Sequence, residues 1–266
     1  LDALRYNLEH IRKMAPENAQ IMAVVKANAY GHGDGMVAAE LERNGVNWFC
    51  VSNVEEAISL RKSGITGKIL ILGMTPVELA SLLVEYKLVQ TVYSPEYAKQ
   101  LNDRLAALGK VLECHLKIDT GMGRIGFVHH DGADALDELL KVCAMPQLKP
   151  TGIFTHYAVA DETNEDSVAY TQKQLASFCD ILSKLEQHGV HLPVAHTKNS
   201  AGIERLTTEH FPFVRAGIIL YGLNPSHEVV DPKMKPVMGL KSVVSMVKRI
   251  PPNTSVSYGR RFISDH

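Results

Sequence analysis

The sequence has no surplus of charge of either sign and no long apolar run. Its 28 lysine and arginine residues nearly balance its 29 aspartate and glutamate residues. No basic stripe is therefore available to bind a phosphate backbone, and we expect no nucleic acid partner. No apolar run approaches the roughly 20 residues of a membrane-spanning helix, and residues 1–5 lack a signal-peptide layout. We expect a soluble, cytoplasmic protein that does not bind membranes.

Paired cysteines are also missing. The four cysteines are widely spread, and none of them forms the Cys-x-x-Cys pair of a zinc knuckle. Their spacing does not suggest a disulfide scaffold either. We expect no metal site, and reduced, mostly buried thiols at Cys50, Cys114, Cys143 and Cys179.

The sequence does contain a regular alternation of strand-like and helix-like segments. Its 266 residues, 45% of them apolar, can bury one large core. A first helix ends before Pro16, and beyond it apolar, β-branched runs predict strands while periodic segments predict helices. The strands are expected to end at Lys26 and to lie near 47–52, 68–72, 88–93, 111–118, 150–155, 193–197 and 213–219, and the helices near 35–44, 54–63, 76–86, 95–108, 132–144 and 166–188.

Eight strands with helices between most of them are typical of a (β/α)8, or TIM, barrel. An open, doubly wound parallel sheet is the competing architecture. We favour the barrel because side chains of functional type follow nearly every strand, whereas an open sheet concentrates them at one switch point. Because the chain begins inside a helix, we also expect a first strand element before residue 1.

Beyond Gly222 the pattern changes. Residues 223–238 have the character of a linker, and from Gly239 to Ile250 apolar residues recur without a helical period. The sequence therefore predicts a barrel domain at 1–222, a linker at 223–238 and the incomplete beginning of a C-terminal all-β domain at 239–266.

A lysine stands at the end of the first predicted strand. Lys26 follows the apolar run that begins at Ile21 and precedes a loop that contains Tyr30 and two glycines. In a parallel barrel its amine would lie at the carboxyl-terminal mouth, where active sites are built. An amine desolvated there can form a Schiff base, although a lysine at a strand end can also simply extend into water.

The fifth predicted strand carries Lys117 and leads into a glycine-rich loop with Arg124. The glycines at 121, 123 and 126 match the dinucleotide-binding fingerprint formally, but no helical pattern opens at Gly126, as that motif requires. We interpret Arg124 as a guanidinium fixed above the barrel mouth, with a surface salt bridge as the simpler alternative. Lys117, on a core strand, needs a negative partner or a modification.

Later strand ends carry further polar groups. His156 follows the sixth strand, and Ser200 follows the seventh, where it could also serve as a helix N-cap. Each is compatible with a purely structural role. Glycines and backbone amides after the last two strands are where barrels commonly hold a phosphate, so Ser200, Gly217 and Ile218 together predict a phosphate-binding cup.

Taken together, these segments resemble the alanine racemase family, whose members use pyridoxal 5'-phosphate and combine an N-terminal (β/α)8 barrel with a C-terminal β domain. The resemblance extends over nearly the whole chain. It is carried by Ala23-Val-Val-Lys26-Ala-Asn-Ala-Tyr30-Gly-His-Gly33, Lys117-Ile-Asp-Thr-Gly-Met-Gly-Arg124-Ile-Gly126, Thr155-His156, Asn199-Ser200-Ala201, Val214-Arg215-Ala-Gly217-Ile218 and Val256-Ser257-Tyr258-Gly259.

The resemblance implies a role for each site residue. Lys26 would form the Schiff base with the cofactor, and Arg215 would face its pyridine nitrogen. Arg124 would lie beside the cofactor's phenolic oxygen and bind the substrate carboxylate. Lys117 matches a position that family members often carbamylate. His156 would orient Arg215 and the catalytic tyrosine, and the remaining cofactor-binding positions are Tyr30, Asn199, Ser200, Gly217 and Ile218.

The implied reaction is the interconversion of L-alanine and D-alanine, which supplies D-alanine for cell-wall peptidoglycan. Racemisation needs a proton removed from one face of the α-carbon and returned to the other. Lys26 would serve one face, and Tyr258 from the partner subunit of a homodimer would serve the other. A cationic neighbour of Tyr258, His156 or Arg215, would have to lower the pKa of its phenol. Because Arg215 does not give up its proton, the pyridine nitrogen would stay neutral. A serine or broad-specificity racemase, and a non-catalytic carrier that binds pyridoxal phosphate, remain open alternatives.

Overall fold

Eight parallel strands close into a barrel in the computed structural model, which describes residues 1–207, 209 and 211–265. Each strand pairs in parallel with the next, and β9 pairs with β1 to complete the ring. The predicted (β/α)8 barrel is confirmed, and an open sheet is excluded because β4 pairs with β5 and β1 with β9, so that each of the eight strands has a neighbour on both sides. The barrel strands are β1 (Gln20–Val24), β2 (Trp48–Val51), β3 (Lys68–Ile71), β4 (Val89–Val92), β5 (Leu112–Asp119), β7 (Leu148–Phe154), β8 (Val194–His196) and β9 (Phe213–Ala216).

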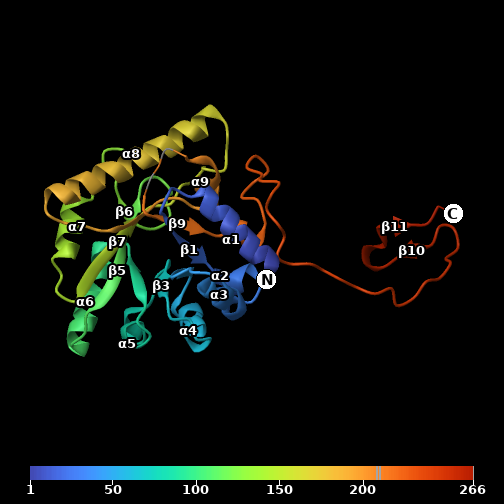
Figure 1. Cartoon of the computed structure of the whole chain (residues 1–266), viewed down its shortest axis with the longest axis horizontal. Coiled ribbons are helices and arrows are strands. Elements are labelled where there is room, and N and C mark those ends of the chain that lie inside the picture. Colours follow the sequence, from blue (N-terminus) through green and yellow to red (C-terminus); the bar gives the residue numbers. More distant parts are fainter. Residues whose placement is uncertain (208, 210, 266) are drawn as a thin grey trace.

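Helices follow most of these strands and cover the outside of the barrel (Figure 1). Side-chain caps explain several of their starts: Asn53, Ser94 and Asn164 each accept a hydrogen bond from the backbone amide three residues later. The helices are α1 (Asp2–Met14), α3 (Asp34–Arg43), α4 (Val54–Lys62), α5 (Ala80–Glu85), α6 (Pro95–Leu108), α7 (Leu136–Cys143), α8 (Glu165–Gln187) and α9 (Ser200–Arg205), with the 3-10 helices η1 (Val77–Leu79) and η2 (Ile218–Tyr221).

The predicted helices agree with the structure to within a few residues, with two differences. The segment 76–86 is divided between η1 and α5. The segment 132–144 becomes helical only at Leu136, whose amide donates to the Asp134 carboxylate. None of the helices in the described part of the chain is long and apolar enough to cross a membrane.

Alternate strand residues build two apolar layers, as the two-residue period of a strand requires. On β1, for example, Ile21 and Ala23 face the surrounding helices, whereas Met22 and Val24 belong to a separate cluster that also holds Trp48. Some inward positions of β5, β8 and β9 instead carry polar yet buried side chains: His115, Lys117, His196 and Arg215. The interior of the barrel therefore combines an apolar cluster with buried polar groups.

The first helix, α1, packs against the outside of the barrel. Its apolar face is fully buried and contacts η2 and α3. The Asn7 side chain donates to the carbonyls of Leu220 and Lys235 at 3.0 and 2.8 Å. The ring contains eight strands between Gln20 and Ala216, and the strand element expected before residue 1 stays a prediction.

The cysteines only partly follow expectation. All four are free thiols. Cys50 and Cys114 are buried, but Cys143 is half-buried and Cys179, on α8, is exposed. The prediction of reduced thiols is confirmed, and that of burial is wrong for Cys179, because the face of α8 that carries it points away from the core.

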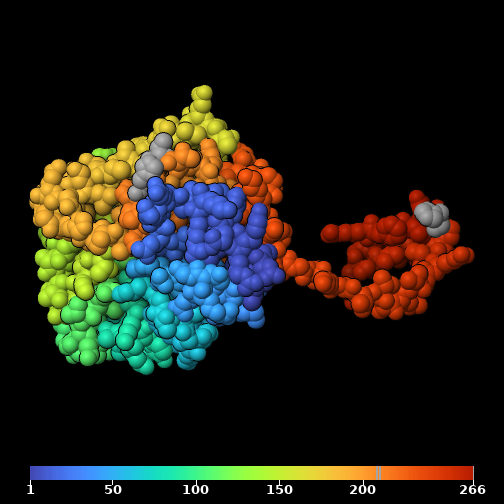
Figure 2. All heavy atoms as spheres, viewed as in Figure 1, coloured from blue at the N-terminus to red at the C-terminus, as the bar shows by residue number. Residues whose placement is uncertain are grey.

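The C-terminal segment lies apart from the barrel (Figures 1 and 2). Part of the linker packs against the barrel, since Val229 and Met234 are buried. Residues 239–250, where strand character was expected, have no regular secondary structure, and Leu240 and Val243 are 99% and 88% exposed. A strand needs a partner for its backbone groups. Beyond the linker, the described residues supply one only for the short antiparallel pair β10 (Ser255–Val256) and β11 (Phe262–Ile263).

Candidate active site

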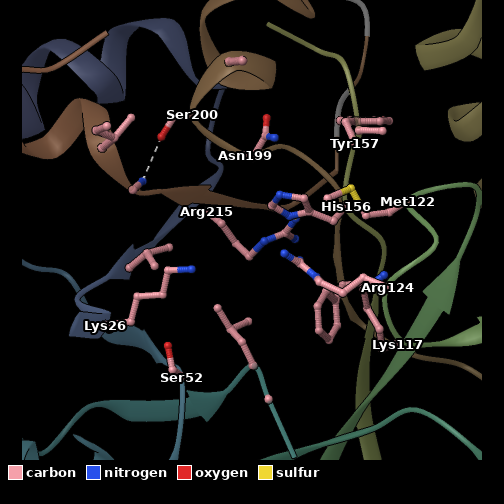
Figure 3. A pocket seen from close by; sticks show the side chains of 18 of the residues that line it. Lys26, Ser52, Lys117, Met122, Arg124, His156, Tyr157, Asn199, Ser200 and Arg215 are labelled. Carbon is pink, nitrogen blue, oxygen red and sulfur yellow. Dashed lines mark hydrogen bonds between the residues drawn. The ribbon is translucent and has the colours of Figure 1, made fainter. Parts of the chain in front are cut away.

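A cavity of about 580 Å³ lies at the carboxyl-terminal ends of the barrel strands. Side chains converge on it from strands far apart in the sequence, with Lys26 and Arg215 pointing toward its centre (Figure 3). The structure brings together every site residue expected from the sequence except Tyr258. Those that line the cavity are Lys26, Tyr30, Lys117, Arg124, His156, Asn199, Ser200, Arg215, Gly217 and Ile218.

Lys26 lies just beyond the first strand and opens a left-handed turn. The strand β1 ends at Val24, two residues earlier than expected, and α2 (Lys26–Tyr30) has positive φ values of 51 to 53° from Ala27 to Tyr30. Non-glycine residues rarely adopt this conformation, which costs roughly 1–2 kcal/mol per residue. Strain of this kind persists only where the surroundings enforce it, and it is common at functional sites. The turn places Lys26 at one end and Tyr30 at the other.

A cradle for an anion lies at the far end of that turn. Ser200 Oγ accepts a hydrogen bond from the Gly217 amide at 3.1 Å. A Cβ on Gly217 would lie 3.0 Å from the Tyr30 hydroxyl and 3.4 Å from Ser200 Oγ, so only glycine leaves this space open. The neighbouring Asn199, not Ser200, caps α9 by accepting from the Gly202 amide at 3.0 Å. Ser200 is therefore not needed as a cap.

Arg215 is held rigidly inside the barrel. Its side chain is buried, and it donates to the carbonyls of Thr155, His196 and Thr197 at 2.8, 3.0 and 2.7 Å. Burial lowers the pKa of Arg215 to about 10, so the group remains a cation at neutral pH. It also lies 3.3 Å from His156 Nδ1.

Two buried histidines continue inward from Arg215. Arg215 NH1 lies 2.6 Å from His196 Nδ1, and His196 Nε2 lies 3.1 Å from His115 Nδ1. Because a guanidinium only donates, His196 must accept at Nδ1 and can then donate from Nε2 to His115. Burial and the Arg215 charge lower the pKa of both histidines, to about 3 for His115. Both are therefore neutral, and Arg215 fixes their tautomers.

These two histidines were not assigned a role from the sequence. The signal that could have found them is the alternation of side chains along a strand. By this alternation His115 shares the inward face of its strand with Lys117, and His196 shares that of its strand with Val194. The ring of His115 also explains a glycine, since a Cβ on Gly152 would lie 2.6 Å from His115 Nε2.

His156 is neutral rather than cationic. Burial, followed by the charge of Arg215, lowers its pKa well below the usual value. His156 or Arg215 was expected as the cationic neighbour of the catalytic tyrosine. Of these two, Arg215 is the one that carries a positive charge at neutral pH.

Lys117 lines the cavity on the side opposite Lys26 (Figure 3). It is 2% exposed, and its Nζ donates to the Ile118 carbonyl at 2.7 Å. Burial and the nearby cations Arg215 and Arg124 lower its pKa to about 7, with Asp119 acting in the opposite direction. No acidic side chain in the described residues forms an ion pair with Lys117. Its amine is therefore substantially neutral near pH 7.

Arg124 extends from the loop after β5. Its side chain lines the cavity, and none of the ion pairs among the described residues involves it, so the salt-bridge alternative is not supported. Asp119 Oδ1 shapes the loop by accepting from the amides of Gly121 and Gly123, both at 3.0 Å. After Gly126 the chain forms the short strand β6 (Phe127–Val128), not a helix. The dinucleotide fingerprint is thus a chance match.

Tyr258 is not part of this cavity. It is fully exposed in the 3-10 helix η3 (Tyr258–Arg260), between β10 and β11, and that hairpin lies away from the barrel (Figure 1). Within the described residues, no cluster of three or more His, Cys, Asp or Glu side chains is arranged to bind a metal ion.

Comparison with known proteins identifies relatives of the whole chain. The family model described as "Alanine racemase, N-terminal domain" matches residues 1–225. The chain is 41% identical over 264 residues to the alanine racemase of Clostridium perfringens (strain SM101 / Type A), covering 98% of this chain and 67% of that protein. It is 40% identical over 267 residues to alanine racemase 2 of Caldanaerobacter subterraneus subsp. tengcongensis, covering 99% and 67%.

Solved structures agree with these sequence relatives. The alanine racemase of Clostridium difficile 630 has a TM-score of 0.91 at 37% identity, covering all of this chain and 68% of that one. The alanine racemase of Bacillus anthracis with bound L-Ala-P has a TM-score of 0.88 at 33% identity, covering 99% and 68%. This chain thus spans about two thirds of the length of its relatives.

Proposed function

Because this chain belongs to the alanine racemase family, a family of isomerases, we propose that it interconverts L-alanine and D-alanine with pyridoxal 5'-phosphate as cofactor. The observation that carries the proposal is the convergence of three groups on one cavity: the Lys26 amine, the Arg215 guanidinium and the Ser200–Gly217 cradle. In bacteria that make peptidoglycan, the product D-alanine would supply the cell wall.

The residues present fit this cofactor. Its aldehyde requires an amine, and Lys26 supplies one; its phosphate requires backbone amides and hydroxyls, which the cradle of Tyr30, Ser200 and Gly217 offers. Ile218 and Asn199 complete the lining. When bound, pyridoxal phosphate acidifies the substrate's α-hydrogen by delocalising the resulting negative charge.

The chain's own residues would then bind the substrate and move the proton. Arg124, without an ion pair among the described residues, is available to the substrate carboxylate. Arg215 remains protonated, so it would donate toward the ring nitrogen and keep that nitrogen neutral. Lys26 would hold or release the proton on one face of the α-carbon.

The second base must come from elsewhere, because Tyr258 lies far from the cavity of its own chain. We propose a homodimer in which Tyr258 of one subunit completes the site of the other. The exposed hairpin that carries Tyr258 supports this, since it is tethered to the barrel only through residues 223–250. The same division supports treating 1–222 as the barrel domain, 223–238 as a linker and 239–266 as the start of a β domain.

Lys117 would be carbamylated in this proposal. Its neutral amine can attack carbon dioxide, forming a nitrogen–carbon bond and releasing one proton to solvent. The product is an anion beside Arg124, so a buried amine without an ion-pair partner among the described residues becomes half of a paired buried charge. The low pKa of Lys117 supports the step, because only the neutral amine reacts.

One observation favours a second candidate. In a single chain Tyr258, the proposed second base, does not line the cavity, which is what a non-catalytic pyridoxal phosphate carrier would show. A racemase for serine or several amino acids is a further alternative with the same residues.

Incubating the full-length protein with L-alanine in deuterated water separates these functions. A racemase yields D-alanine with deuterium at the α-carbon, whereas a carrier yields neither. Borohydride should trap the cofactor on the peptide containing Lys26. Trapping without D-alanine would support the carrier, and the absence of trapping would refute both. Parallel incubation with L-serine measures substrate breadth.

A further inference from the structure

Glu56 links two backbone segments at the edge of the cavity. It lies in the first turn of α4, where its carboxylate accepts from two amides that belong to different elements. Oε1 accepts from Ala27 N at 2.8 Å, and Oε2 accepts from Ser52 N at 2.7 Å. Ala27 directly follows Lys26, and both Ser52 and Lys26 line the cavity from the same side (Figure 3).

The carboxylate is itself fixed. The backbone amide of Glu56 donates to Asn53 Oδ1 at 2.9 Å in the cap of α4, so the side chain starts from an anchored position. Hydrogen bonds from backbone amides to a carboxylate are stronger than neutral ones. Glu56 thus joins the rigid start of a helix to the first amide of the left-handed turn.

That turn needs support from outside. Four consecutive non-glycine residues, from Ala27 to Tyr30, have positive φ values, and the chain would relax to a more common conformation without enforcing contacts. At its far end Tyr30 packs on Tyr221 with ring centroids 5.0 Å apart. At its near end the contact is the Glu56 carboxylate.

We propose that Glu56 is a positioning residue for the cofactor lysine: its carboxylate holds the left-handed turn that presents Lys26 and Tyr30 to the same ligand. Glu56 contacts neither substrate nor cofactor in this assignment and acts only through the backbone at Ala27. The inference rests on the proposed function, since it assumes that Lys26 attaches the cofactor's aldehyde and Tyr30 contacts its phosphate.

A matched pair of variants isolates this role. Glu56→Gln retains the size of the side chain and one acceptor oxygen, but its NH2 group faces the second amide, so one of the two hydrogen bonds is lost. Glu55→Gln is the control. Glu55 lies in the same first turn, is exposed, and makes no hydrogen bond or ion pair among the described residues, so this variant makes the same charge change without touching the turn.

The first measurement is backbone hydrogen exchange in the full-length protein without cofactor. Loss of a hydrogen bond to a charged group should raise the exchange of the amides at 27–31 by roughly tenfold to a hundredfold in Glu56→Gln. Glu55→Gln should exchange like the wild type. Equal exchange in all three proteins would overturn the proposal without reference to activity.

The second measurement is the rate at which added pyridoxal phosphate becomes trappable by borohydride on Lys26. Glu56→Gln should be slower by a similar factor, while Glu55→Gln stays at the wild-type rate. Equal slowing in both variants would show an effect of net charge and overturn the role of Glu56. Glu56→Ala should be slower still; if it does not fold, Glu56→Gln alone decides.

The outcomes also separate this inference from the proposed function. If the wild-type protein traps no cofactor at Lys26, the proposed function fails, and the role of Glu56 toward that ligand fails with it. If the wild type traps the cofactor and racemises alanine while Glu56→Gln attaches it as fast as the control, only the role of Glu56 fails.

Discussion

The barrel and the C-terminal segment hold their reactive side chains in opposite ways. Arg215, on β9, is 3% exposed and is fixed by carbonyls from two strand ends, whereas Tyr258, in the hairpin, is 100% exposed. The barrel therefore holds the side chains that we propose for cofactor binding in fixed positions within one chain. The C-terminal segment leaves Tyr258, the proposed base for the opposite face of the substrate, without contacts that would fix its position on the barrel.

This contrast has a physical basis. A closed barrel satisfies all of its strand edges and encloses its polar side chains, so their geometry is set within one chain. The segment 239–265 has few pairing partners and exposes most of its apolar side chains, so its position depends on whatever it packs against. The division predicts a site that one chain begins and a second chain completes.

The largest expected effect comes from removing the two proposed bases in separate chains. Lys26→Ala and Tyr258→Phe should each lower kcat/KM for L-alanine by at least about a hundredfold, the lower range for loss of an acid–base group. Mixed dimers of the two variants should recover activity, because one of their two sites combines an intact Lys26 with an intact Tyr258. Racemase assays on co-expressed, differently tagged full-length chains measure this.

The experiment distinguishes a Tyr258 that acts in the partner's cavity from one that acts in the cavity of its own chain. If Tyr258 served the cavity of its own chain, no site in the mixed dimer would hold both groups, and activity would stay at the level of the single variants. Homodimers of each variant, purified by the same steps, are the control.

A smaller effect is expected from crowding the phosphate cradle. In Gly217→Ala the new methyl group would lie 3.0 Å from the Tyr30 hydroxyl. Overpacking of about 1–3 kcal/mol should weaken pyridoxal phosphate binding roughly tenfold to a hundredfold. Gly239→Ala, in the C-terminal segment, has no atom within 4 Å of its new Cβ and should leave affinity unchanged. Equilibrium titration tests both, and equal affinities would remove Gly217 from the phosphate site.

A third prediction concerns pH and Lys117. Burial lowers its pKa from 10.5 to about 7, so between these values the unfolded chain binds a proton that the folded chain does not. The free energy of unfolding therefore increases as the pH rises from about 7 to 10.5. Replacing Lys117 by Met should stabilise the protein most below pH 7, with the gain shrinking toward pH 10.

Urea unfolding of the full-length protein at several pH values measures this difference in buffers free of carbon dioxide, where Lys117 stays an amine. The exposed Lys110→Met is the control. A gain independent of pH would contradict the depressed pKa. Labelled bicarbonate should also give a carbamate signal by carbon-13 NMR in the wild type and none in Lys117→Met.

The smallest effect is expected when an exposed side chain of the C-terminal segment is shortened, and a buried side chain of the barrel serves as the reference. Leu8, on α1, is fully buried, and Leu8→Ala should destabilise the barrel by about 2–5 kcal/mol. Val243 is 88% exposed, so in the 266-residue chain Val243→Ala should change stability by no more than about 0.5 kcal/mol. Thermal unfolding of both variants checks the difference. A large loss in Val243→Ala would show that the segment packs on the barrel after all.

Much of the fold could be predicted from the sequence, because strand and helix periods are local. The eight strands and most helices follow from apolar spacing, and the glycines near Lys26 and Arg124 mark the loops that build the mouth. The grouping of Lys26, Arg124, Ser200 and Arg215 also followed, since the carboxyl ends of parallel strands meet at one edge.

What the tertiary structure alone decided depends on contacts between distant residues. The pairing of β9 with β1 closes the barrel, and the reach of Glu56 to Ala27 supports a turn whose left-handed conformation no propensity favours. The neutral state of His156 and the low pKa of Lys117 arise from burial beside Arg215. The sequence by itself predicted the side chains that meet at the cavity, but not the supporting residues His115, His196 and Glu56. The protonation and strain of the site were decided by long-range neighbours, because desolvation and enforced backbone geometry exist only after folding.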